Sequence, residues 1–239
     1  MLIVVGTGIL IAWLYYRNQN SAEDPRVAHA RELLLRFDRL MKEAKYDAGF
    51  PLLDSTEMIY RELPCYAASF EMGVVYNNRG SAWLSMALYK TDDTVRKAEM
   101  LFLAEKEVRK SIAAYETWMN HFRALPATEI ESGVMQCFPA HDKAFQGLNY
   151  GRLVKKRIED IELARVETPR RLSVAYSNLG IIQRHQYKQD SAIGSYIRAL
   201  KLWKRNPTAK NNLNTLLGKP AEDESIINQL FPPDRRKPD

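Results

Sequence analysis

The segments YSNLG (residues 176–180) and AIGSYIRAL (residues 192–200) decide the fold of this 239-residue chain. Each contains a small residue, Gly180 in the first and Ala192 in the second, which lets two successive helices approach closely. Tyr196 would fill the gap between those helices. The Asn-Leu pair of the first segment recurs 34 residues later. Because one helix pair cannot bury its own apolar face, a period of this length predicts pairs that stack on one another.

Residues 170–207 resemble a tetratricopeptide repeat, and residues 208–217 resemble the helix that caps such a stack. Residues 26–124 resemble one or two diverged units of the same family, whereas residues 125–168 carry no recognisable match. The resemblance implies an all-α fold of antiparallel helix pairs, stacked as a short solenoid that holds other proteins. The first unit is degenerate, because its first helix has no small residue near Phe37.

The spacing of apolar residues predicts further helices before the clear repeat. The Asp-Pro pair at residues 24–25 is a strong start signal, with a carboxylate N-cap and a proline at the first helical position. Pro169 is expected to open the clear repeat. No alternation typical of strands occurs in the sequence. The expected helices cover residues 26–45, 51–63, 64–90, 94–124, 128–137 and 140–166.

The uncharged segment at residues 2–16 predicts a single N-terminal transmembrane helix. Its fifteen residues would rise only ~22 Å, against a hydrocarbon core of ~30 Å, but its aromatic end suits a membrane interface. It lacks the basic region and small-x-small cleavage site of a signal peptide. The alternative is a buried N-terminal helix. The chain then divides into an anchor (1–16), a linker (17–24), a helical domain (25–219) and a disordered tail (220–239).

The charges around the anchor predict that the helical domain lies on the cytoplasmic side of the membrane. Arg17, Arg26 and Arg31 follow the apolar segment, and no basic residue precedes it. Loops rich in Lys and Arg stay on the cytoplasmic face. So few charges are involved that an exported, periplasmic domain is the alternative.

The residue types that usually carry chemistry form no recognisable site. The four histidines lie far apart, so no metal or cofactor is expected. Neither a glycine-rich phosphate loop nor a nucleophile motif occurs, so we expect neither an enzyme nor a small-molecule substrate. The net charge of +6 is spread along the chain, which does not indicate nucleic-acid binding. Cys65 and Cys137 stand in apolar contexts and are expected to be buried free thiols.

The resemblance also implies where a partner would bind. In the tetratricopeptide family, alternate positions of the first helix line a concave groove. Chaperone-binding members of the family hold a peptide carboxylate with a lysine and an asparagine. In this chain, Ser177 and Ile181 stand at those positions. We therefore expect a groove of apolar and amide character, suited to an amphipathic helix or an extended segment. Carried onto this chain, the groove positions are Val174, Ser177, Ile181, Arg184 and His185, with Thr208, Asn211 and Thr215 on the closing helix.

The expected function is that of a membrane-anchored adaptor that recruits an unidentified protein partner through this groove. The alternative is a structural subunit of a larger membrane assembly, such as a secretion, envelope or motility machine. The expected helices at 94–124 and 140–166 favour the alternative, because they are longer than regular repeat helices.

Overall fold

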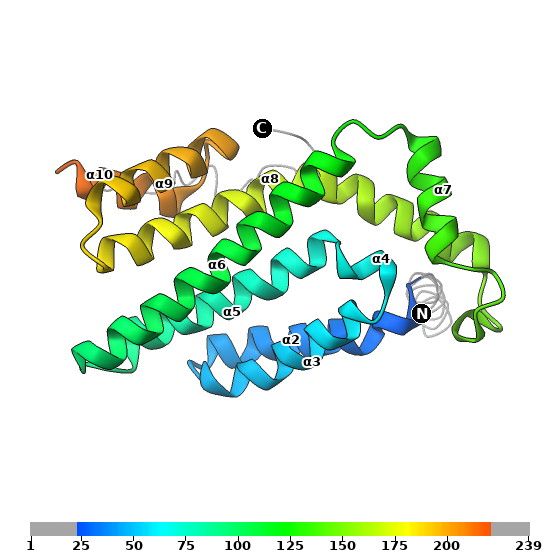
Figure 1. The fold of residues 1–239 in the computed structure, drawn as a ribbon, viewed down its shortest axis with the longest axis horizontal. Coiled ribbons are helices and arrows are strands. Elements are labelled where there is room, and N and C mark those ends of the chain that lie inside the picture. Colours follow the sequence, from blue (N-terminus) through cyan, green and yellow to red (C-terminus); the bar gives the residue numbers. More distant parts are fainter. Residues whose placement is uncertain (1–22, 221–239) are drawn as a thin grey trace, which may run out of the picture.

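The computed structural model describes residues 23–220, and every regular element in that range is a helix (Figure 1). The prediction of an all-α fold is confirmed. Asp24 accepts a hydrogen bond from the backbone N–H of Arg26 (3.0 Å), so the first helical turn begins where the Asp-Pro pair predicts. The α-helices are α2 (Ala28–Lys42), α3 (Phe50–Arg61), α4 (Pro64–Ala67), α5 (Phe70–Tyr89), α6 (Thr94–Phe122), α7 (Ala127–Cys137), α8 (Tyr150–His185), α9 (Gln189–Leu202) and α10 (Pro207–Leu216), and the 3-10 helices are η1 (Pro25–Val27), η2 (Asp47–Gly49) and η3 (Lys143–Phe145).

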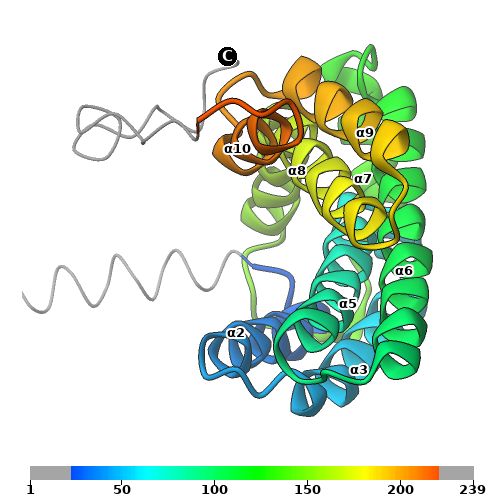
Figure 2. The same cartoon turned by 90° about the vertical axis from the view of Figure 1, so that its left-hand side faces the viewer.

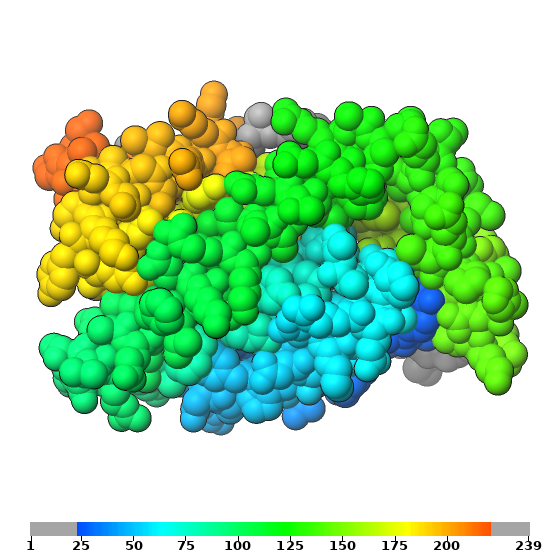
Figure 3. Space-filling model, in the orientation of Figure 1, coloured from blue at the N-terminus to red at the C-terminus, as the bar shows by residue number. Residues whose placement is uncertain are grey.

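The helices follow one another along an arc (Figure 2). Helices α2, α5, α8 and α10 form its inner row, and α3, α6 and α9 form its outer row. Helix α6 crosses the face seen in Figure 3, between the α9–α10 end and the α3–α5 layer. The inner face, defined as the side lined by the inner row, is the concave side of the arc.

Two helix pairs pack through the same contact, in which a glycine of the inner helix meets a tyrosine ring of the outer helix. A Cβ atom added to Gly180 would lie 2.4 Å from Cε1 of Tyr196, and one added to Gly73 would lie 2.4 Å from Cε1 of Tyr115. Carbon atoms in contact ordinarily stand about 3.5–4.0 Å apart, so neither position has room for a side chain. The predicted contact between Gly180 and Tyr196 is confirmed, and its recurrence makes α5–α6 and α8–α9 similar units.

The α2–α3 pair also packs closely, but here the large residue lies on the inner helix and the glycine on the segment that faces it. Phe37 of α2 is buried, and a Cβ atom added to Gly49, directly before α3, would lie 2.8 Å from its ring. The small residue missing near Phe37 is thus supplied by the facing segment. The first unit is degenerate in sequence but keeps the close packing of its helices.

The two asparagines that stand 34 residues apart each form a hydrogen bond with the preceding inner helix. The side-chain amide of Asn178 on α8 donates to Asn77 Oδ1 (3.1 Å) and to Ser81 Oγ (3.0 Å) on α5. The amide oxygen of Asn212 on α10 accepts from Nη1 of Arg184 on α8 (3.1 Å). Each asparagine therefore reaches back to the preceding inner helix, as residues at the same position of a repeat would.

A buried arginine joins the first helix pair to the second. Arg79 of α5 lies 2.9 Å from Asp54 and 2.8 Å from Glu57, both on α3, and 3.2 Å from Glu107 on α6. Burial by itself would lower the pKa of Arg79, but its carboxylate partners, Glu57 first, raise the pKa above its ordinary value. The guanidinium therefore stays charged and holds three helices together.

The segment expected as one helix at residues 64–90 is divided into α4 and α5. Ser69 has extended backbone dihedrals, and its hydroxyl donates to the carbonyl of Tyr66 (2.7 Å). A serine side chain bonded to nearby backbone competes with helical hydrogen bonds, which explains the break. The apolar spacing alone carries no sign of that local bond.

One long helix, α8, replaces the helix expected at residues 140–166 and the new start expected at Pro169. A proline inside a helix costs about 3 kcal/mol, because it lacks the N–H donor and crowds the preceding turn. Ile161 and Leu172, before and after this proline, are both buried in the core, and this packing keeps α8 continuous. The prediction of a helix boundary at Pro169 is wrong for that reason.

Helix α7 is tied to α4 by a disulfide bond between Cys65 and Cys137, whose Cα atoms are 5.5 Å apart. The expectation of free thiols is therefore wrong. The two cysteines stand 72 residues apart in the chain, and only the fold brings them together.

The predicted anchor at residues 2–16 and nearly all of the predicted tail lie outside the described residues. Between residues 23 and 220, no helix combines the length and the apolar character that a membrane span requires.

Candidate functional site on the inner face

The centre of the inner face is a strip of α8 that lies between α5 and α10. Asn178 bonds to α5 on one side of this strip, and Arg184 bonds to α10 on the other. Val174, Ile181 and His185 are seven and four residues apart, and so share one face of the helix. Viewed along the helix axis, this face lies between the sides that carry these two contacts. We call these three residues the α8 strip.

The α8 strip offers a partner a small apolar surface. The side chain of Val174 is 38% exposed, and Ile181 is half-buried. His185 is also half-buried, and burial, followed by the charges of Arg184 and Lys97, lowers its pKa below the ordinary value. The imidazole is therefore neutral at pH 7, so it can both donate and accept a hydrogen bond.

Ser177 is one of the predicted groove residues, but it is buried at the contact between α8 and the start of α10. Its hydroxyl donates to the carbonyl of Ser173 (2.9 Å) and accepts from the amide of Asn206 (2.9 Å). Asn206 also accepts from the backbone N–H of Ala209 (3.0 Å), which makes it the N-cap of α10. The serine thus fixes where the closing helix docks, and its side chain is buried from any partner.

The remaining predicted groove residues lie on α10 or at its contact with α8. Arg184 is held by Asn212, as described above. Thr208 and Thr215 are exposed, and Asn211 is half-buried. The hydroxyl of Thr215 donates to the carbonyl of Asn211 (2.9 Å). The structure therefore brings the α8 strip and these α10 side chains to neighbouring helices of the inner face.

A separate cavity of about 300 Å³ lies where α4, α6, α7 and α8 meet. Its walls are mainly apolar, with Trp118, Ile130 and Ile161 among them, and the disulfide bond forms part of the lining. Arg157 reaches this cavity but is already paired with Glu71. His121 and Glu129 are the other titratable residues in its lining.

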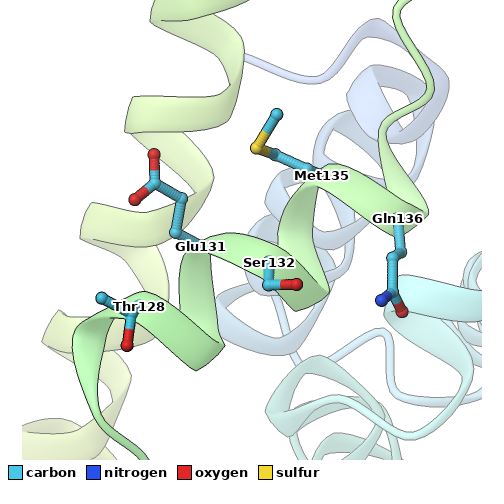
Figure 4. Close-up of a pocket in the computed structure, with 5 residues that line it drawn as sticks. All are labelled: Thr128, Glu131, Ser132, Met135 and Gln136. Carbon is cyan, nitrogen blue, oxygen red and sulfur yellow. The ribbon is translucent and has the colours of Figure 1, made fainter.

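A shallow hollow follows the surface of α7 (Figure 4). All of its lining side chains come from that one helix; Glu131 and Met135 extend from one side of α7 and Gln136 from the other. Side chains that diverge in this way do not converge on a ligand. The five lining residues are Thr128, Glu131, Ser132, Met135 and Gln136.

Across residues 23–220, no group of three or more His, Cys, Asp or Glu side chains is arranged to hold a metal ion. The chain matches no protein-family model, no curated protein and no solved structure. The resemblance to tetratricopeptide repeats therefore stays a prediction from the sequence.

No local sequence pattern indicates two features of this region. The first is the disulfide bond, because the residues beside the two cysteines carry no pairing signal. The second is the contact of Asn206, whose amide donates to serine hydroxyls on α8. The asparagine before Pro207 is a helix-start signal that could have located the N-cap. Nothing in the sequence indicates which side chains that asparagine bonds.

Proposed function

We propose that this protein is a membrane-anchored adaptor of the tetratricopeptide type, which holds a protein partner against the α8 strip and α10. The observation that carries the proposal is the recurrent glycine–tyrosine contact of α5–α6 and α8–α9. Close packing of each pair supports an ordered stack, in which the inner helices share one concave face. Repeat stacks present such faces to partners.

The chemistry of the inner face indicates what kind of segment would bind. Val174 and Ile181 supply apolar contacts, whereas the exposed Thr208 supplies a hydroxyl group. This combination suits an amphipathic helix or an extended peptide with an apolar anchor. A partner whose main feature is a terminal carboxylate is a poorer match, because Ser177 is buried against Asn206 and Ile181 is apolar.

Residues 2–16 would serve as the anchor that keeps the adaptor in the membrane. Confinement to a surface raises the effective concentration of the adaptor near other membrane proteins. An affinity that is modest in solution would then be sufficient for recruitment.

Photo-crosslinking from the inner face tests this proposal. A photoreactive amino acid replaces Val174 on the inner helix α8 in one variant and Ile197 on the outer helix α9 in a control. The two sites are matched, because their side chains are 38% and 41% exposed. We expect the Val174 variant to form a discrete crosslinked product in native membranes and the Ile197 variant to form none. Equal products from both sites, or none from Val174, would contradict the proposal.

A structural subunit of a larger assembly is the second candidate, and an exposed face of α6 favours it. Val95 and Phe102 are each 66% exposed and stand seven residues apart, so they share one face of a helix in the outer row. A photoreactive group at Phe102 that crosslinks while the Val174 variant does not would favour this candidate over the adaptor.

A further inference from the structure

The disulfide bond fastens a helix that has few other attachments to the core. Helix α7 has eleven residues, and only Ile130 and Val134 among them are buried. The bond joins Cys137, the last residue of α7, to Cys65 in α4. Besides the bond, α7 is held by these two apolar side chains and by Arg26, which donates to the carbonyl of Cys137.

The surroundings of both cysteines are built to hold them. The guanidinium of Arg157 donates to the carbonyl of Cys65 (3.2 Å), and that of Arg26 donates to the carbonyl of Cys137 (3.3 Å). Each guanidinium also lies over an aromatic ring, at 4.2 Å for Arg157 and 4.6 Å for Arg26. Arg157 is buried and paired with Glu71, so its position is fixed from the other side as well. The two half-cystines are therefore positioned by separate, part-buried contacts.

These are the only two cysteines in the chain, so neither has another internal partner. Over the described range, no metal-binding group includes them. A Cα separation of 5.5 Å lies in the usual range for disulfides. The bond thus closes a loop between cysteines that stand 72 residues apart.

We infer that the helical domain folds and works in an oxidising compartment, such as a periplasm, an endomembrane lumen or the cell exterior. Stable structural disulfides belong to such compartments, because the cytosol keeps thiols reduced. The inference places the helical domain on the exported side of the membrane, whereas the arginines after residue 16 predict the cytoplasmic side. It does not depend on the proposed partner, since it concerns only where the domain folds.

Bond formation requires an oxidant, and a disulfide-carrying oxidoreductase of that compartment supplies it. The thiolate of one cysteine attacks the donor disulfide, whose S–S bond breaks as a mixed disulfide forms. The thiolate of the other cysteine then attacks the protein sulfur of this mixed disulfide and displaces the donor sulfur bound to it. The two cysteines lose two electrons, the donor disulfide is reduced to two thiols, and the two cysteine protons end on the donor sulfurs.

Acid trapping of the full-length protein in its native cells tests whether the bond exists there. Rapid acidification stops exchange, and a polymer-coupled maleimide then marks every free thiol by a gel shift. We expect no shift without reductant and a double shift after reduction. Cys137→Ser serves as the calibration variant, because it shifts once without reductant. A double shift of the wild-type protein before reduction would overturn the inference.

A labelling experiment on the Ser191→Cys variant tests the side of the membrane. Ser191 is exposed at the start of α9, whereas the native cysteines lie on α4 and α7. We expect a membrane-impermeant maleimide to label this variant, and not the wild type, in intact cells stripped of any outer envelope. Labelling only after the membrane is permeabilised would overturn the inference, even if the bond were present. A failure of Val174 crosslinking in the same cells would affect only the adaptor proposal.

Discussion

Replacing Gly180 by alanine tests the contact that defines the α8–α9 unit. The added Cβ atom would lie 2.4 Å from Cε1, 2.7 Å from Cδ1 and 2.8 Å from Cζ of Tyr196. Tyr196 is fully buried, so its ring has no free space to enter, and α8 and α9 must separate or the ring must shift by about 1 Å. Overpacking of this kind costs about 1–3 kcal/mol of unfolding free energy.

The same substitution also gains stability, because alanine favours a helix over glycine by about 1 kcal/mol. Gly194→Ala isolates the steric part of the effect. Gly194 is exposed within α9, and an added Cβ atom there would meet nothing within 4 Å. The helical gain is common to both variants and cancels in their difference. We therefore expect Gly180→Ala to be less stable than Gly194→Ala by about 1–3 kcal/mol.

Urea and thermal unfolding of the full-length protein in detergent, followed by circular dichroism, measure this difference. For a domain of this size, each kcal/mol corresponds to about 2–4 °C in melting temperature. Adding Tyr196→Leu to the Gly180→Ala variant should reduce the steric cost, with a coupling energy of at least about 0.5 kcal/mol. Equal stability of the two alanine variants, or a strictly additive double variant, would refute the close-approach explanation.

Two further predictions concern titratable or polar groups. The hydroxyl of Tyr196 is buried without a hydrogen-bond partner among the described residues, and burial raises its pKa to about 12. Tyr196→Phe should therefore be neutral or slightly stabilising in urea unfolding. Tyr176→Phe should instead lose about 1 kcal/mol, because the Tyr176 hydroxyl donates to Glu116 (2.7 Å). The reverse order would contradict this. Because the folded pKa of His185 is lowered, the unfolded chain binds the proton more readily, and stability should fall as pH drops below about 6.5. His185→Gln should weaken that dependence in urea midpoints measured across pH, and an unchanged slope would show that other groups control it.

The parts of the fold that follow from local patterns are predictable from the sequence. The small residue at Gly180, the bulky ring at Tyr196 and the 34-residue recurrence of asparagine all depend on positions within one unit or its neighbour. The helix starts at Asp24 and Asp93 depend on a carboxylate that bonds the next backbone N–H groups. Each of these signals acts over a few residues, so one sequence is enough to find it.

The parts that were not predictable depend on contacts between distant segments. Pro169 reads locally as a helix start, but packing on both sides outweighs its local cost. Cys65 and Cys137 have no spacing that pairs them. Ser177 has the spacing of a groove residue, yet Asn206 covers it. In each case the deciding partner lies on another segment of the chain, where a pattern within one helix cannot show it.

Helix α8 also limits how the length of this protein can change during evolution. Its 36 residues span about 54 Å as one rod, from the cavity beside the disulfide to the contact at Gly180. Inserting one residue near Pro169 would rotate everything beyond it by about 100° and turn Gly180 away from Tyr196. Only insertions of about seven or eleven residues would bring Gly180 back to the side of the helix that faces Tyr196. Insertions and deletions should therefore collect in turns such as residues 91–93, while the length of the rod stays fixed.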